Sequence, residues 1–156
     1  QSIVGFPSLP SRVAGGEGLE LWIGCSAAIG ATAHNVTVQY TNSQGTAGRN
    51  TVSTAGIASM PANRMYQVLL QSGDTGVASV QSLTLSASSG TAGNLWVMLL
   101  ERIASIACPI PNVGVSADFA TLALPVIGAE ACPLLVHQAT ATSSGIIMGQ
   151  MSIIEG

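Results

Sequence analysis

Short apolar runs, separated by clusters of glycine, serine and asparagine, fill the chain from residue 19 onward. The most regular run covers residues 36–41 and alternates strictly, with Val36, Val38 and Tyr40 on one face. Alternation with a period of two predicts a β-strand that buries one face. Because turn residues follow and a second β-prone run comes at residues 51–54, we expect a β-hairpin there.

Similar runs recur along the rest of the chain. Strands are expected at residues 19–29, 65–71, 77–86, 95–100, 133–142 and 146–154. The candidate core residues of one of these strands are Val80, Leu83 and Leu85. A helix is the alternative for residues 95–107, since Leu, Met, Glu and Arg favour helices.

The connection at residues 109–124 contains proline, asparagine and glycine, and we expect one helical turn near residues 118–122. Elsewhere the chain lacks long stretches with the helical period of about 3.6 residues. About eight short strands joined by turns indicate an all-β fold. We therefore expect a single antiparallel β-sandwich, or jelly-roll-like, domain at residues 19–156.

The first 18 residues differ from the rest of the chain in being rich in proline and glycine. Proline breaks helices and glycine loosens the backbone, so residues 1–18 are predicted to form an extended N-terminal arm. Such an arm becomes ordered by lying on its own domain or on a neighbour. Its apolar residues are the candidate partner-binding residues: Ile3, Val4, Phe6 and Leu9.

One short motif occurs twice, as Gly45-Thr46-Ala47-Gly48 and as Gly90-Thr91-Ala92-Gly93. Each copy follows an alternating run and precedes another apolar run. Two similar hairpin tips are the simpler interpretation, and duplication of half a sandwich is the alternative.

Charge is scarce in this chain. Charged residues make up 7% of the sequence, lysine is absent and the net charge is −3, whereas soluble domains usually carry about 25% charged residues. A lone soluble protein uses surface charge to stay dispersed and to keep sheet edges from pairing. A subunit covered by neighbours does not need that charge. We therefore favour an assembly subunit over a solitary secreted β-domain with a Ser/Thr/Gly-rich surface.

The same composition argues against two classes of partner. Four scattered arginines do not supply the basic face that nucleic acid requires. The most apolar windows, such as residues 95–100, are far shorter than the roughly 20 residues of a membrane-spanning helix. We expect neither a nucleic-acid partner nor a membrane partner.

No pattern in the sequence indicates catalytic, cofactor-binding or metal-binding residues. His34 and His137 have no His, Cys, Asp or Glu at the spacings of metal motifs, so both are expected to be structural or solvent-facing. The few acidic residues are expected to form structural ion pairs, and Gly73-Asp74-Thr75-Gly76 is expected to be a turn. The chain is therefore predicted not to be an enzyme.

The three cysteines, Cys25, Cys108 and Cys132, each have apolar neighbours and are expected to be buried free thiols. One disulfide, or a link between chains, is the alternative. Core packing is also expected of the aromatic residues in the strand patterns: Trp22, Tyr40, Tyr66 and Trp96.

Two segments resemble parts of small β-rich structural proteins of tailed bacteriophages. They are Val36-Thr-Val-Gln-Tyr-Thr-Asn-Ser-Gln-Gly-Thr-Ala-Gly-Arg49 and Leu70-Gln-Ser-Gly-Asp-Thr-Gly-Val-Ala-Ser-Val-Gln-Ser-Leu-Thr-Leu85. The resemblance covers residues 33–107. It implies a virion component, in particular a capsid decoration (cement) protein that caps junctions between major capsid subunits. Such proteins often are trimers of jelly-roll-like domains without catalytic residues, so the resemblance implies a homotrimer on the capsid surface.

A tail or fibre module that contacts host-surface glycans is the alternative. Carbohydrate recognition uses exposed aromatic faces, which would gather at loop tips in such a module. An enzyme is the third class considered, and it would require a histidine that is hydrogen-bonded to a carboxylate beside an open cleft.

Overall fold

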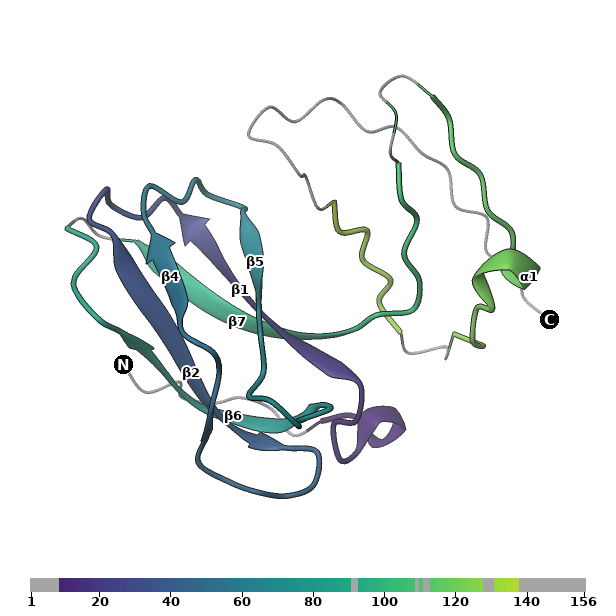
Figure 1. Cartoon of the computed structure of the whole chain (residues 1–156), viewed down its shortest axis with the longest axis horizontal. Helices are drawn as coiled ribbons and strands as arrows, with labels where there is room; N and C mark the ends of the chain where they lie inside the picture. Colours follow the sequence, from purple (N-terminus) through teal and green to yellow (C-terminus); the bar gives the residue numbers. More distant parts are fainter. Residues whose placement is uncertain (1–8, 91–92, 109, 111–112, 128–130, 138–156) are drawn as a thin grey trace. The chain divides into compact units, whose positions relative to one another are not determined.

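Nearly all regular structure of the chain is antiparallel β-sheet (Figure 1). The computed structural model describes residues 9–90, 93–108, 110, 113–127 and 131–137. The chain divides into two compact units, Gln1–Leu124 and Pro125–Gly156. Within the described residues seven strands occur, all in the first unit, with a short 3-10 helix and one helical turn. The prediction of an all-β fold is confirmed.

The strands form two small sheets. The β1 sheet contains three strands in the order β5-β1-β7: β1 (Leu19–Ala27), β5 (Met65–Val68) and β7 (Asn94–Glu101). The β2 sheet contains four strands: β2 (His34–Asn42), β3 (Arg49–Asn50), β4 (Thr54–Ile57) and β6 (Val77–Leu85). Because β6 pairs along one edge of β2, the short strands β3 and β4 share its other edge.

The pairing follows a nested order. The consecutive strands β1 and β2 are the central strands of their sheets. On one side they are flanked by β5 and β4, and on the other side by β7 and β6. Each flanking pair is consecutive in the chain, so three pairs of consecutive strands each contribute one strand to each sheet.

The inward faces of both sheets belong to a single hydrophobic cluster. From β2 it includes Val36, Val38 and Tyr40, which are fully buried, as the strict alternation of the sequence predicts. Facing them are Leu21, Ile23 and Cys25 of β1, which are also fully buried. Burial of these side chains is the main source of free energy that holds the two sheets together.

Strand β6 buries every third residue, because it contains two irregularities. Its buried residues are Val77, Val80 and Leu83. The register against β2 shifts between Gln39 and Tyr40 and again between Thr41 and Asn42. At each shift β6 has one extra residue, and such a bulge returns the next apolar side chain to the inward face.

Most predicted strands are confirmed, with changes at their ends. The hairpin return at residues 51–54 is split into β3 and β4, and residues 95–100 form a strand, not the alternative helix. Residues 102–107 contain neither strand nor helix, and the predicted helical turn is present as α1 (Phe119–Leu122). The strand predicted at 133–142 is absent from its described part, residues 133–137. The strand predicted at 146–154 lies outside the described residues.

The second copy of the repeated motif is not a hairpin tip. The first copy, residues 45–48, joins β2 to β3 within one sheet. The second, residues 90–93, joins β6 to β7, which belong to different sheets. Small residues of this kind are common in many types of connection. The repeated motif therefore does not indicate two similar hairpin tips.

The described part of the predicted N-terminal arm is held against the β-domain. Residues 11–13 form a 3-10 helix, and Gly16 then crosses the turn before β6. The amide of Val77 donates to the carbonyl of Gly16 at 2.9 Å, and a Cβ on Gly16 or Gly76 would overlap the backbone opposite. Only glycine permits this close approach. Of the candidate partner-binding residues, Leu9 is half-buried, and Ile3, Val4 and Phe6 lie outside the described residues.

Candidate interaction surface

A buried polar cluster at Asp74 joins two strands and the connection between two others. Its carboxylate accepts hydrogen bonds from the Tyr40 hydroxyl at 2.5 Å, from Asn42 Nδ2 at 2.8 Å and from Arg49 Nε and Nη2 at 2.9 and 3.0 Å. The Tyr40 hydroxyl in turn accepts from the amide of Gln71 at 2.9 Å. Asp74 therefore ties the β5–β6 connection to β2 and to β3.

The electrostatics of the cluster favour the ionised carboxylate. The hydrogen bonds from Arg49, and next those from Tyr40 and Asn42, lower the pKa of Asp74 to about 2, against the opposing effect of burial. Burial, and then the hydrogen bond to Asp74, raises the pKa of Tyr40. A charge paired in this way stabilises the fold at neutral pH.

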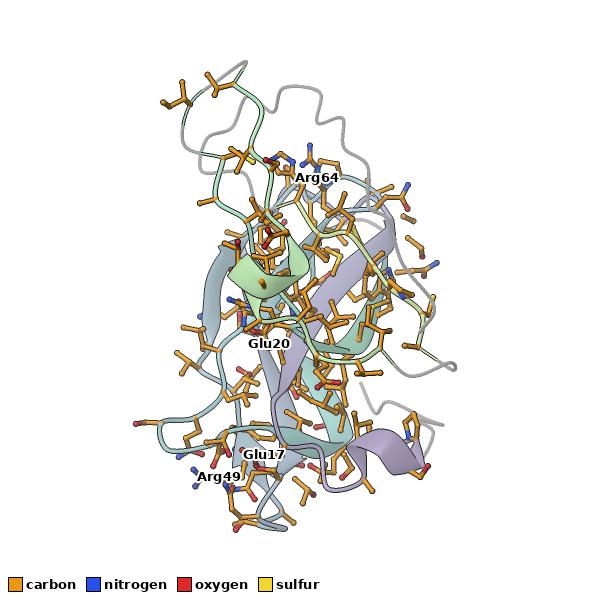
Figure 2. All side chains as sticks on the ribbon, turned by 90° about the vertical axis from the view of Figure 1, so that its right-hand side faces the viewer. Glu17, Glu20, Arg49 and Arg64 are labelled. Atoms are coloured by element: carbon orange, nitrogen blue, oxygen red, sulfur yellow. The ribbon has the colours of Figure 1, made fainter. Side chains whose placement is uncertain are left out.

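Glu17 and Arg49 lie at the same end of the strands, and Arg64 lies at the other (Figure 2). Hydrogen bonds from Ser43, and then from Thr75, lower the pKa of Glu17. An open groove of about 450 Å³ runs between residues 18–21 and 67–75 and borders on Asp74. The Asp74 carboxylate already accepts hydrogen bonds from Tyr40, Asn42 and Arg49. It is therefore not available in this groove as a general acid or base.

The histidines do not join a carboxylate in the described part of the chain. His34 is the first residue of β2 and is buried, which agrees with the first of the two expected roles, structural or solvent-facing. Its Nδ1 lies 3.0 Å from the carbonyl of Thr32, and its Nε2 is buried without a hydrogen-bond partner. His137 is exposed. Among the described residues, no group of three or more His, Cys, Asp or Glu side chains could hold a metal ion.

The remaining acidic residues have structural roles where the structure describes them. Asp118 accepts a hydrogen bond from the amide of Thr121 at 2.7 Å and so caps α1; the bonds from Thr121 lower its pKa. Glu20 forms an ion pair with Arg102 at 2.7 Å and accepts a hydrogen bond from the Trp22 indole at 3.2 Å. The prediction of structural ion pairs is confirmed for Glu20.

The predicted burial is correct for one cysteine and wrong for two. Cys25 is a buried free thiol that donates to the carbonyl of Pro61 at 3.0 Å. Cys108 and Cys132 are free but exposed. Apolar neighbours in the sequence predicted burial, but these two residues lie in segments that form no sheet.

The aromatic residues divide in the same way. Trp22 and Tyr40 are buried as predicted, and Trp96 is half-buried. Tyr66 is exposed, contrary to the prediction, because it lies on the short edge strand β5. An edge strand has a neighbour on one side only, so even an inward-pointing side chain stays open to solvent.

The outer face of the β1 sheet is apolar, although sheet faces directed away from a core are normally polar. Core residues alternate along β1, so Trp22 and Gly24 point outward. Their register partners share that face: Met65 and Gln67 from β5, and Trp96 and Met98 from β7. Leu100 of β7, the partner of Glu20, lies on the same face. Trp22 is only 5% exposed, and the Trp96 ring lies over Gly24 so closely that a Cβ there would overlap it.

A second apolar surface lies in the chain after β7. Residues 103–117, here named the apolar segment, contain no charged residue. Their large apolar side chains are largely exposed: Ile106, Ile110, Val113 and Val115. In the second unit, Val126 is 96% exposed and Leu135 is 84% exposed. Exposed apolar side chains that are frequent along one stretch of chain are typical of surfaces that another chain covers.

Sequence reasoning placed the interaction residues at the N-terminus and missed the apolar segment. Its signal was present, because residues 103–117 combine apolar side chains with a complete lack of charge. No helix among the described residues is long and apolar enough to cross a membrane. No protein-family model, no curated protein and no solved structure matches the chain.

Proposed function

We propose that the chain is a non-enzymatic structural protein of a virus particle. The specific role proposed is that of a capsid decoration, or cement, protein, which stabilises contacts between major capsid subunits on the capsid surface. The observation that supports this most directly is the apolar segment, an uncharged stretch whose large side chains are exposed. Exposed apolar surface is unfavourable in water and becomes favourable when neighbouring subunits cover it.

The scarcity of charge supports the same role. The ion pairs of the described residues, Arg49 with Asp74 and Arg102 with Glu20, link segments of the same chain. In a permanent lattice an uncharged surface avoids the cost of removing ions from water. The resemblance of residues 33–107 to bacteriophage structural proteins adds the viral setting to this physical argument.

The fold proposed in finer detail is a jelly-roll-like sandwich. Its support is the nested pairing, in which β1 pairs with β7 in one sheet and β2 pairs with β6 in the other. Pairing of early strands with late strands within two packed sheets is typical of jelly rolls. A homotrimer of such domains is the assembly that the resemblance implies.

The proposal is tested by locating the chain in purified particles. Mass spectrometry of the particles should find the chain in a fixed ratio to the major capsid protein. Capsids that lack the chain should come apart at a lower temperature than capsids that contain it. Absence of the chain from the particles, or its presence only on isolated tails, would contradict the capsid role.

The contribution of the N-terminal arm needs a truncation that spares the fold. Residues 16–18 are hydrogen-bonded to residues 75–77, so the deletion should stop at residue 8. A chain lacking residues 1–8 should fold normally and bind particles more weakly. Unchanged occupancy on the particles would remove Ile3, Val4 and Phe6 from the binding surface.

The alternative, a glycan-binding tail or fibre module, has less support. Among the aromatic side chains that the structure describes, Tyr66 is the only exposed one, and it lies on a strand. Sugar binding normally stacks the ligand on several aromatic faces. Binding to a glycan array that is lost in Tyr66→Ala would favour this alternative over the capsid role.

A further inference from the structure

Strand β7 is a long edge strand whose outer edge is open. It is eight residues long and pairs with β1 alone in the part of the chain that the structure describes. Each edge strand presents a row of backbone N–H and C=O groups that are not satisfied by a neighbouring strand. The outer edge of β7 is thus a template for one additional strand.

Apart from Glu101 at its end, β7 has none of the usual protections against such pairing. Natural edge strands are protected by charge, by proline, by bulges or by being short. Residues 94–100 contain no charged residue and no proline. The opposite edge of the β1 sheet differs, because β5 has four residues and the amide of Val52 donates to the carbonyl of Leu69 just beyond its end.

The apolar segment is a suitable strand donor. Residues 103–108, which precede the prolines at 109 and 111, are uncharged, include the β-branched Ile103 and Ile106, and lie outside any sheet. Ile106 is 48% exposed, so a side chain that would pack on a neighbour is available. Donor and acceptor both lack charge, so their association desolvates no ion, whereas a charged partner segment would pay that cost on an apolar edge.

A hairpin between β7 and the residues that directly follow it is disfavoured by the local sequence. To form such a hairpin, the chain would have to reverse its direction directly after Glu101. The next residues, Arg102-Ile103-Ala104-Ser105, include no glycine, proline, asparagine or aspartate, the residues that tight hairpin turns require. The first such residue is Pro109, and a reversal there would bring the chain back beside residues 102–108 and not beside β7.

We infer that residues 103–108 of a second copy of this chain add a strand to the outer edge of β7. Each copy donates a segment and accepts one, so the contact is head-to-tail and closes into a ring when the rotation permits. This inference rests on the proposed structural role and names the partner: an identical subunit. A trimer is one closed form of such a contact.

The test uses two matched lysine substitutions in the full chain. Met98 on β7 and Gln67 on β5 are both register partners of Trp22 and share the outer face, but they lie on opposite edges of the sheet. Light scattering after size exclusion should find the wild type as an oligomer, Met98→Lys as a monomer and Gln67→Lys as an oligomer. A monomeric wild type, or equal loss of the oligomer in both variants, would overturn the inference.

A mixing experiment keeps the test informative if Met98→Lys fails to fold. The donor variant Ile106→Lys changes an exposed residue outside the sheets and should be a folded monomer. Because the contact is head-to-tail, Ile106→Lys retains a functional acceptor edge and Met98→Lys retains a functional donor. Mixing the two folded variants should therefore yield a one-to-one dimer. If Met98→Lys is unfolded, Ile106→Lys alone decides, since an intact oligomer in that variant overturns the inference.

Thiol labelling shows which chain covers the edge. Cys108 lies in the donor segment and is exposed in the single chain, whereas Cys25 is buried. In a Cys132→Ser background, Cys108 should react slowly with a maleimide in the oligomer and rapidly in the Met98→Lys monomer. A monomeric wild type with a protected Cys108 would show that the segment folds back on its own sheet, which overturns the inference.

Failure of the inference and failure of the proposed function are distinguishable. A chain that is monomeric in solution but present on capsids retains the structural role and loses the exchange of segments. If Met98→Lys disrupts the oligomer but the chain is absent from every particle, the added strand between subunits is supported and the viral role is contradicted.

Discussion

The two sheets share one core but differ on their outer faces. The outer face of the β2 sheet contains only hydroxyl and amide side chains along its paired strands: Thr37, Gln39, Thr41, Ser79, Ser82 and Thr84. The outer face of the β1 sheet contains tryptophan, methionine and leucine at the equivalent positions. One sheet is therefore suited to water, and the other is suited to being covered on both faces.

The two sheets also differ in how their strands are fixed. The β2 sheet is held at one end by the charged cluster around Asp74, whereas the β1 sheet is held by the Trp96 ring over Gly24. The stability that the Asp74 cluster contributes depends on the ionisation of its carboxylate, whereas the packing of Trp96 on Gly24 depends on the fit of the two residues. The following predictions test this difference, from the largest expected effect to the smallest.

Replacing Asp74 should cause the largest loss of stability. Asp74→Ala leaves Tyr40, Asn42 and Arg49 without their common acceptor, in a site where the carboxylate is 2% exposed. The expected cost is about 3 kcal/mol in the free energy of unfolding, measured by urea denaturation. The control is Asp118→Ala, which removes only an exposed helix cap and should have a much smaller effect on stability.

Acid should weaken the β2 sheet through the same residue. The pKa of Asp74 is about 2 in the fold and 3.8 ordinarily, so its contribution is fully present above pH 3.8. That contribution declines as the pH falls toward 2 and amounts to roughly 2 kcal/mol in total. In Asp74→Asn the unfolding free energy should lose this part of its dependence on pH, and an unchanged acid profile would contradict the assignment.

Filling the space above Gly24 should cost less, and the cost should depend on Trp96. Gly24→Ala forces the indole ring to move and should lower stability by about 1.5 kcal/mol. In a Trp96→Leu background the same substitution should cost clearly less, because the obstructing ring is gone. Equal costs in both backgrounds, measured as a double-mutant cycle, would show that the two residues are independent.

A charge on the outer face of the β2 sheet should have the smallest effect. Thr37→Lys places an ammonium group on a half-buried polar position and should change stability by less than about 0.5 kcal/mol. It should also leave the state of association unchanged, in contrast to Met98→Lys on the β1 sheet. A loss of association in Thr37→Lys would mean that the polar face is also an interface.

The strands of the first 101 residues could be predicted because their pattern is local. Strict alternation gave β2 and its buried face, and turn residues located most strand ends. The two apolar faces of the β1 sheet were harder to predict from the sequence. The runs of β1 and β7 do not alternate, so they indicate a strand without showing which side chains point to which face. The bulges of β6 depend on the register with β2, which no single run contains.

The cluster around Asp74 and the segments after β7 show where local reasoning fails. Asp74 was recognised as a turn residue, but its partners come from residues 25 to 34 positions away in the sequence. Residues 133–137 are β-prone and yet form no strand, because strand formation depends on pairing with a distant segment as well as on the local sequence. The scarcity of charge could have pointed to Asp74, since it is the only acidic residue between Glu20 and Glu101.

The outer face of the β1 sheet has a practical consequence for spectroscopy. Both tryptophans of the chain, Trp22 and Trp96, belong to that one face. Intrinsic emission therefore reports on a single surface of the protein, without any label. Because Trp22 is already shielded and Trp96 is half-buried, a blue shift on assembly would signal that water has left Trp96, and its concentration dependence would give the affinity.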